Sequence, residues 1–153
     1  MERCTRQVSW TRGHLVSRFL LDTNVISEPL RPQPNPAVIQ RLQQYQGEFA
    51  IASVTWHELL FGCYRLPTYR RRERIEQYLK KIIQPNIPIL SYNYVAAEWF
   101  ASERARLVII GKTSAYPDGQ IAAIAKVNGL ILVTNNISDY TDFHELQLDN
   151  WFS

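Results

Sequence analysis

The chain has few of the residues that form disulfide frameworks or zinc sites. Its 153 residues include two cysteines, Cys4 and Cys63, and three histidines. Two cysteines do not make a disulfide framework, and no set of Cys and His residues has the spacing of zinc ligands. A glycine-rich phosphate-binding loop is also absent, so nothing in the sequence indicates a nucleotide-binding protein.

Long hydrophobic segments are absent as well. No apolar run is long enough to span a bilayer, so we expect no membrane partner. The first residues carry Arg3, Arg6 and Arg12, but Ser17 and Arg18 interrupt the apolar residues that follow. No signal-peptide core forms there, and we therefore expect a cytoplasmic protein. The net charge of +3 permits a nucleic-acid partner without requiring one.

What is present is the composition and the alternation of one α/β domain. Hydrophobic residues make up 46% and charged residues 20%, an ordinary globular balance. Short apolar runs predict strands at 19–22, 49–52, 87–90, 130–134 and 146–148. Helices are predicted between them, beginning near Asn35, Ser53 or Thr55, Thr68, Tyr94 and Pro117. This order predicts a three-layer α/β/α fold around a mostly parallel five-stranded sheet, with Pro88 marking an edge strand. We assign 19–153 to this domain and 1–18 to a mobile appendage outside it.

The segment Phe19–Asn24 organises the rest of the chain. Three apolar residues lead directly into Asp22, as in a strand that is buried on both faces and ends at the carboxyl edge of a parallel sheet. Ligands of open α/β sheets bind outside that edge. Asp22 is therefore a candidate catalytic residue. The alternative is that Asp22 only caps a helix that begins at Val25, since Asp is a preferred N-cap residue.

Further acidic and polar residues fall at comparable places. Glu58 lies one turn into the helix after the second strand, Asp118 begins the helix before the fourth strand, and Asn136 and Asp139 follow that strand. Each has a simpler explanation: Glu58 as a solvated residue, Asp118 as a residue favoured by the helix dipole, and Asn136 as a turn residue. The joint arrangement favours a site.

An acidic cluster of this kind predicts a metal site. Clustered carboxylates repel one another, and a hard divalent cation removes that cost. Mg²⁺ takes oxygen ligands and is commonly bound by one or two carboxylates together with substrate phosphates. The pattern therefore predicts metal-assisted hydrolysis of a phosphodiester.

Four segments in this order resemble the PIN-domain ribonucleases, and most closely the VapC and FitB-type toxins of toxin–antitoxin pairs. They are Leu20–Glu28, His57–Gly62, Pro117–Ala125 and Val133–Asn136. The resemblance implies a PIN fold, dependence on Mg²⁺ or Mn²⁺, endonucleolytic cleavage of RNA, and a homodimer. It also implies a small antitoxin partner, with operator DNA bound only through that antitoxin.

The resemblance also assigns roles to residues of this chain. Asp22, Glu58 and Asp118 match the three core acidic positions of the family and are the implied metal ligands. Asn24 and Thr134 match its polar support. The fourth acidic position is Asp in many members and is Asn136 here, so Asp139 becomes the candidate that supplies a charge in its place. The segment 1–18 has no counterpart in the family pattern.

Basic residues supply candidates for RNA binding. Arg104, Arg106 and Lys112 precede Asp118 in the sequence and are the residues we expect to steer RNA into the site. A second basic stretch at Arg70–Arg74 is either a solvated helix face or a surface that binds phosphates or an acidic partner.

Other α/β classes fit the sequence less well. A phosphatase of the haloacid dehalogenase type needs a second Asp two residues after the first, where this chain has Asn24. A receiver domain needs an Asp at the end of the third strand, where this chain has Ser91. The remaining alternative is a catalytically weak PIN scaffold that mainly binds the antitoxin and represses DNA.

Overall fold

The computed structural model describes Val8, Trp10 and residues 16–153. Val8 is buried, and the Trp10 ring packs edge-on against Phe49 and Tyr78 at centroid distances of 6.3 Å each. These two side chains therefore pack on the domain, although we expected the whole segment 1–18 to lie outside it. The other residues of 1–15 fall outside the described part of the chain.

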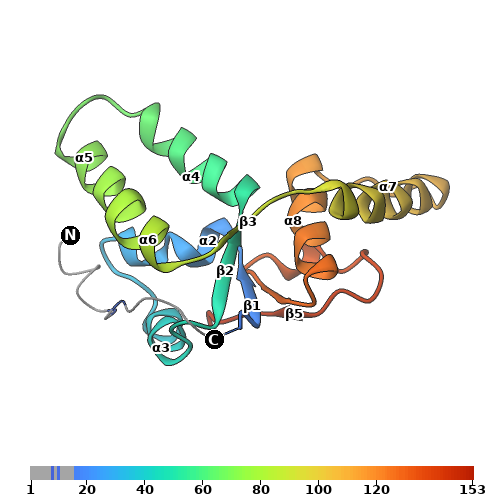
Figure 1. Ribbon diagram of the computed structural model, residues 1–153, viewed down its shortest axis with the longest axis horizontal. Coiled ribbons are helices and arrows are strands. Elements are labelled where there is room, and N and C mark those ends of the chain that lie inside the picture. Colours follow the sequence, from blue (N-terminus) through green and yellow to red (C-terminus); the bar gives the residue numbers. More distant parts are fainter. Residues whose placement is uncertain (1–7, 9, 11–15) are drawn as a thin grey trace.

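The described residues form a five-stranded sheet in which all paired strands are parallel (Figure 1). Its strands are β1 (Phe19–Leu21), β2 (Phe49–Ala52), β3 (Ile89–Leu90), β4 (Ile131–Val133) and β5 (Leu148–Asp149), in the order β3-β2-β1-β4-β5. The predicted fold class is confirmed. The Pro88 prediction also holds, because β3 is an edge strand.

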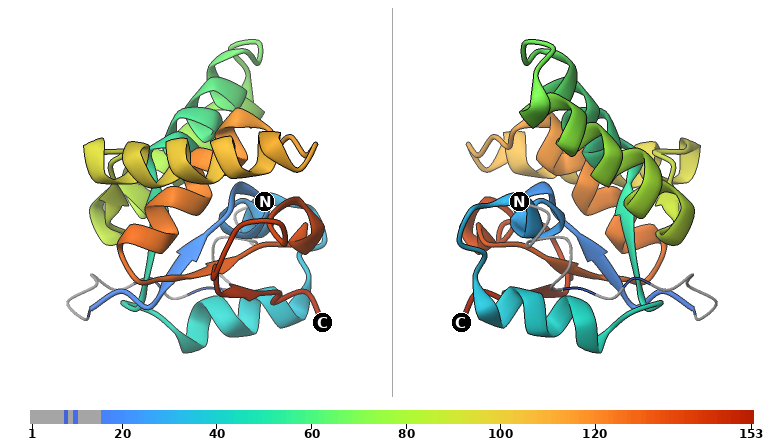
Figure 2. Two further views of the ribbon diagram at one scale, coloured as in Figure 1. Left: turned by 90° about the vertical axis from the view of Figure 1, so that its right-hand side faces the viewer. Right: turned by 90° about the vertical axis from the view of Figure 1, so that its left-hand side faces the viewer.

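Helices cover both faces of the sheet. On one face lie α2 (Thr23–Ile26), the 3₁₀ turn η1 (Glu28–Leu30), α3 (Pro36–Gln44), α4 (Ser53–Tyr64), α5 (Arg70–Gln77), the π-helix η2 (Tyr78–Ile83) and α6 (Gln84–Asn86). On the other face lie α7 (Tyr94–Ile109) and α8 (Tyr116–Val127), which pack against each other (Figures 1 and 2). A 3₁₀ turn, η3 (Ile137–Asp139), follows β4.

Alternation along the strands divides the core between the two faces. Phe19 and Leu21 pack with the α2–α6 side, whereas Leu20 between them packs with α7 and α8. The same alternation separates Phe49 and Ile51 from their small neighbours in β2. Because successive side chains of a strand point to opposite faces, these continuous apolar runs fill two cores at once.

Local sequence signals explain several helix ends. The Asn35 side chain accepts hydrogen bonds from the N–H groups of Ala37 (2.9 Å) and Val38 (3.4 Å), which caps α3 as expected for Asn before Pro36. Gly129 ends α8 with a positive φ of 66°. The helix predicted from Thr68 to Ile83 begins at Arg70, and its second half is the π-helix η2.

No helix of the described segments is long and apolar enough to cross a membrane.

Candidate functional site

Asp22 sits directly after β1 at the carboxyl edge of the sheet. Its N–H donates to the carbonyl of Val133 (2.9 Å), which continues the pairing of β1 with β4 for one residue. Its Oδ1 atom accepts the N–H of Thr23 (2.8 Å) and so caps the four-residue helix α2. The N-cap alternative is therefore correct, but it accounts for only one of the two carboxylate oxygens.

The second oxygen of Asp22 accepts hydrogen bonds from outside α2. Oδ2 accepts from the Thr134 hydroxyl (2.9 Å), the Tyr140 hydroxyl (3.1 Å) and, at 3.5 Å, the Asn24 amide. Asn24 in turn accepts the N–H of Asn135 through its side-chain oxygen (3.0 Å). The chain just beyond β4 is thus fastened to the chain just beyond β1. Asp22 is 7% exposed, so this carboxylate is held in a buried and specific orientation.

Asp118 faces the same point from the first turn of α8. Its Oδ1 atom accepts the Tyr140 hydroxyl at 3.5 Å. Burial raises the pKa of Asp118, and the charges of Asp139 and Asp22 raise it further, while the Tyr140 hydrogen bond acts in the opposite direction. The start of α8 and the end of β1 therefore bring two carboxylates together.

Glu58 approaches from α4 on the other side of the sheet. Burial raises the pKa of Glu58, and the charges of Asp22 and Asp118 add to that rise. Three elements far apart in the sequence therefore place carboxylates within electrostatic reach of one another. Carboxylates that disfavour each other's ionisation are typical of functional sites.

The arrangement suits a hard cation, although the ligand set is not closed. In the parts of the chain described here, no three acidic, His or Cys side chains converge closely enough to form a ready-made metal site. Two observations support the fit. The three carboxylates repel, which a divalent cation would relieve, and the buried hydroxyl of Thr23, beside Asp22, has no hydrogen-bond partner.

Asn136 and Asp139 follow β4 as expected but differ in what they contact. Asn136 is exposed, and its backbone N–H donates to the Thr134 hydroxyl (3.0 Å). The charge of Asp139 acts on Asp118. A cavity of about 260 Å³ adjoins this point. Its polar lining includes Thr113, Ser114, Asp118, Ser138, Asp139 and Asp142.

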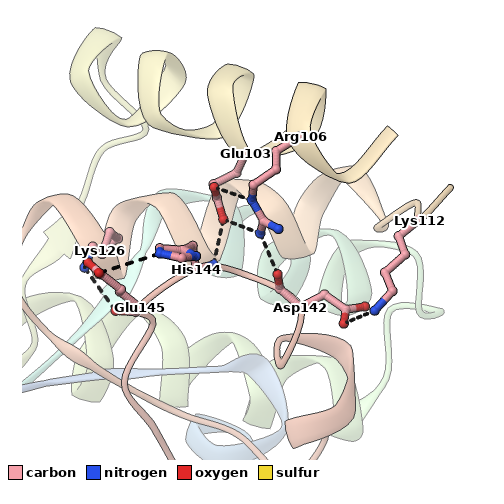
Figure 3. Close-up of polar contacts among 7 residues, drawn as sticks. All are labelled: Glu103, Arg106, Lys112, Lys126, Asp142, His144 and Glu145. Carbon is pink, nitrogen blue, oxygen red and sulfur yellow. Dashed lines mark hydrogen bonds and ion pairs between the residues drawn. The ribbon is translucent and has the colours of Figure 1, made fainter. Parts of the chain in front are cut away.

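The residues expected to bind RNA are engaged to different degrees. Arg106 makes two hydrogen bonds to the Glu103 carboxylate (2.9 and 3.1 Å) and one to the Asp142 carbonyl (2.7 Å) (Figure 3). Lys112 pairs with the Asp142 carboxylate at 2.9 Å. Arg104 is exposed and lies over the Tyr116 ring, 5.4 Å from its centre. Arg104 therefore contacts an aromatic ring, whereas Arg106 and Lys112 are engaged with carboxylate or carbonyl oxygens.

The basic stretch at Arg70–Arg74 lies in α5, which packs against α4 on the side of the molecule opposite α7 (Figure 1). Arg70 and Arg71 are exposed. Arg72 lies over the Tyr64 ring and donates to the Leu66 carbonyl (3.4 Å), so it joins α5 to the end of α4. One part of the stretch is thus structural, and another part faces solvent.

Sequence reasoning missed two residues near the site. Tyr140 is 1% exposed and contacts both Asp22 and Asp118. Glu103 is 7% exposed and accepts the N–H of His144 (2.6 Å) as well as Arg106. The one available signal for Glu103 was its spacing of three residues from Arg106 on a helix. For Tyr140 the one available signal was the presence of an aromatic residue in an otherwise polar loop.

Comparisons with known proteins agree with this geometry. A model of the PIN domain matches residues 19–142. The chain is 36% identical to the toxin FitB of Neisseria gonorrhoeae over 80% of this chain and 90% of that protein. It is 31% identical to the tRNA(fMet)-specific endonuclease VapC of Shigella flexneri over 88% of this chain and 98% of that one. A solved structure of FitAB bound to an IR36 DNA fragment superposes with a TM-score of 0.82 at 30% identity, covering 88% of this chain and 96% of that chain.

Proposed function

Because the chain belongs to the PIN-domain family, we propose that it is an Mg²⁺-dependent endoribonuclease, the toxin of a toxin–antitoxin pair. The observation that carries this proposal is the convergence of Asp22, Glu58 and Asp118 from three elements. Burial and the charges of Asp22 and Asp118 raise the pKa of Glu58, and burial and the charges of Asp139 and Asp22 raise the pKa of Asp118. The names of the relatives support RNA as the substrate. We place the reaction in the cytoplasm, where such an RNA would be met.

Asp22, Asp118 and Glu58 are the residues that would hold the cation, with Mn²⁺ able to replace Mg²⁺. Bound there, a divalent cation supplies charge stabilisation at the phosphate and a water of lowered pKa. Thr134 and Asn24 keep Asp22 oriented through their hydrogen bonds to Oδ2. Asp139 adds negative charge beside Asp118, a role that the neutral Asn136 side chain cannot fill.

The chemistry follows from having carboxylates as the reactive groups of this site. Water attacks the phosphorus, the bond from phosphorus to the 3′ oxygen breaks, and that oxygen takes up a proton. The products are a 5′-phosphate and a 3′-hydroxyl. Attack by the ribose 2′-hydroxyl would instead leave a 2′,3′-cyclic phosphate and would need no metal of this type. Analysis of the product ends distinguishes the two reactions.

The decisive experiment compares wild type with Asp22→Asn in an RNA cleavage assay with Mg²⁺ and with chelator. We expect Asp22→Asn to lose most of the activity, because the buried carboxylate is replaced by an amide of the same shape. Glu98→Gln is the matched control, since it makes the same chemical change on an exposed turn of α7. Full activity of folded Asp22→Asn, or of wild type in chelator, would contradict the proposal. A wild type without activity would favour the scaffold alternative.

We also propose a homodimer and a small antitoxin partner, with operator DNA bound only through the antitoxin. The solved FitAB–DNA structure supports the antitoxin and the DNA. Three exposed apolar residues at the end of α7 support the dimer: Val108 is 60%, Ile109 84% and Ile110 55% exposed. Sedimentation at micromolar concentration that shows only a 17.8 kDa species would contradict the dimer.

The solvent-facing arginines of α5 offer a second surface for acidic partners or RNA. Replacing Arg70 and Arg71 with Gln should weaken binding and flatten its salt dependence, because fewer counterions are released. A salt dependence unchanged for both RNA and antitoxin would leave this stretch as a solvated helix face.

A further inference from the structure

The Tyr140 hydroxyl lies between two carboxylates, Asp22 and Asp118, that are far apart in the sequence. The hydroxyl is 3.1 Å from Asp22 Oδ2 and 3.5 Å from Asp118 Oδ1. We propose that Tyr140 is a positioning residue that sets Asp22 and Asp118 facing each other so that one cation can reach both. This inference rests on the proposed function, since it concerns how that site is arranged.

The hydroxyl is placed to do what the other donors cannot. Thr23 and Thr134 donate to Asp22 alone, whereas the Tyr140 hydroxyl is the one side-chain group among the described residues within hydrogen-bonding distance of both carboxylates. Its single proton points to one oxygen at a time, and Asp22 Oδ2 is the nearer acceptor. Because both acceptor oxygens lie within hydrogen-bonding distance of the Tyr140 hydroxyl oxygen, the distance between them cannot exceed the sum of the two hydrogen-bond lengths. Tyr140 therefore limits how far the start of α8 can move from the end of β1.

Tyr140 also determines which oxygen of Asp22 is free. Oδ2 accepts the Thr134 and Tyr140 hydroxyls at close range, which occupies its two lone pairs, while the Asn24 amide lies farther away at 3.5 Å. Oδ1 accepts only the Thr23 N–H at close range and keeps a lone pair available. Loss of the Tyr140 hydroxyl would open a lone pair on Oδ2 while Thr23 and Thr134 still hold the carboxylate, so a cation could meet either oxygen and the ligand would be less well defined.

The position of Tyr140 is itself fixed by α7. The Tyr140 ring packs against Phe143, which packs against Trp99 and Phe100 of α7 at centroid distances of 6.0 and 6.4 Å. Beyond Phe143, the His144 N–H donates to Glu103 (Figure 3). We give the name loop anchor to the contacts that Phe143 and His144 make with α7, together with the Arg106 hydrogen bond to the Asp142 carbonyl. A buried ring attached to an anchored loop can hold two carboxylates in place.

The test is Mn²⁺ titration of the purified metal-free full chain by calorimetry, comparing wild type with Tyr140→Phe. We expect Tyr140→Phe to bind Mn²⁺ about 10- to 100-fold more weakly, the usual effect of losing a hydrogen bond that orients a ligand. In RNA cleavage, kcat should fall while KM stays unchanged, because the hydroxyl contacts carboxylates rather than RNA.

The matched control is Tyr78→Phe. The Tyr78 hydroxyl is equally buried and donates to the Ile26 carbonyl (2.8 Å), so its removal costs a comparable hydrogen bond elsewhere in the core. Tyr78→Phe should unfold at lower denaturant concentration and keep the wild-type Mn²⁺ affinity. A second variant, Glu103→Gln, weakens the loop anchor without touching the carboxylates. It should reduce Mn²⁺ affinity less than Tyr140→Phe, and the double variant should be no worse than Tyr140→Phe alone.

The outcomes separate the two proposals. Equal or tighter Mn²⁺ binding by Tyr140→Phe would overturn the role of Tyr140 and leave the proposed function intact. A loss of affinity in Tyr78→Phe equal to that in Tyr140→Phe would also overturn it, because the effect would then be one of general stability. A wild type that binds no Mn²⁺ would overturn the proposed function and the role of Tyr140 together.

Discussion

Strand β2 presents side chains of very different size to the two faces of the sheet. Towards α2–α6, the sheet presents Phe19, Leu21, Phe49 and Ile51. Towards α7 and α8, β2 presents only alanines, and the facing side of α8 is itself rich in buried alanine. Small residues on both surfaces allow α8 to lie close to the sheet, because little side-chain volume separates the two backbones.

The two faces therefore contribute differently to folding stability and to the placement of the site residues. The bulky face buries large side chains, which contribute most of the hydrophobic stabilisation per residue. The alanine-rich face buries less but brings the first turn of α8, and hence Asp118, to the end of β1. Glu58 then arrives from α4 on the bulky face, so the site forms where the two faces meet at the sheet edge.

The largest expected effect on folding is on the bulky face, at Leu42. Leu42 in α3 is fully buried, so Leu42→Ala should lower the free energy of unfolding by about 2–5 kcal/mol through lost burial and a residual cavity. Urea unfolding measures the loss. Mn²⁺ affinity of the folded fraction should be unchanged, and a fall in that affinity would show that the two faces are not independent.

A smaller loss of stability with a larger loss of function is expected from Gly119→Ala. A Cβ atom at Gly119 would collide with the Phe100 ring, which is itself packed against Tyr116 and Phe143. We expect about 1–3 kcal/mol of destabilisation from overpacking, together with reduced cleavage as α8 moves outward. Gly62→Ala in α4 is the control, because nothing lies within 4 Å of its Cβ position. Equal stability of both variants would mean that Phe100 can move aside freely.

The loop anchor should contribute stability that depends on pH. The Arg106 hydrogen bonds hold the pKa of Glu103 below its ordinary value, more than offsetting the opposing effect of its burial. A carboxyl whose pKa is lowered by folding stabilises the protein above its ordinary pKa, and that contribution is lost as the pH falls through the lowered value. Glu103→Gln should therefore cost about 1–2 kcal/mol at pH 7, and the difference from wild type should shrink in acid. A difference that is constant down to pH 3 would contradict this assignment.

The smallest effect on the free energy of unfolding, and one of opposite sign, is expected from Glu58→Gln. Burial and the charges of Asp22 and Asp118 raise the pKa of Glu58, so folding favours its protonated form. That contribution is fully present below the ordinary pKa of a glutamate and is lost as the pH rises through the raised value. At pH 7 the metal-free Glu58→Gln protein should therefore be slightly more stable than wild type, by less than about 1 kcal/mol because Glu58 is partly exposed, while cleavage is lost. Thermal unfolding in chelator at pH 7 and in acid measures both the gain and its disappearance.

Much of the fold could be predicted from the sequence because its signals are local. Short apolar runs marked the strands, and Asn35 followed by Pro36 marked a helix start. Asp22 could be placed at the sheet edge for the same reason. The π-helix at Tyr78–Ile83 could not be predicted, because i→i+5 bonding depends on tertiary packing rather than on residue type.

The part of the site that sequence reasoning missed depends on contacts across the chain. The sequence around a tyrosine in a polar loop does not show whether its hydroxyl contacts solvent or two carboxylates. Likewise, Arg106 could be recognised as a basic residue, but its bonds to Glu103 and the Asp142 carbonyl follow from where the loop returns to α7. Val8 and Trp10 pack on the core although the segment around them lacks periodicity.

The sequence separation of the Asp22 contacts has a consequence for synthesis. Asp22 is made early, whereas Thr134 and Tyr140, its hydrogen-bond partners, lie 112 and 118 residues farther along the chain. The pairing of the central strand β1 with β4 is likewise delayed until β4 has been made, because parallel neighbours are joined by long connections. A growing chain on the ribosome therefore carries Asp22 without these partners until the segment through Tyr140 has emerged. The timing of translation alone keeps the unfinished polypeptide from having an assembled carboxylate site.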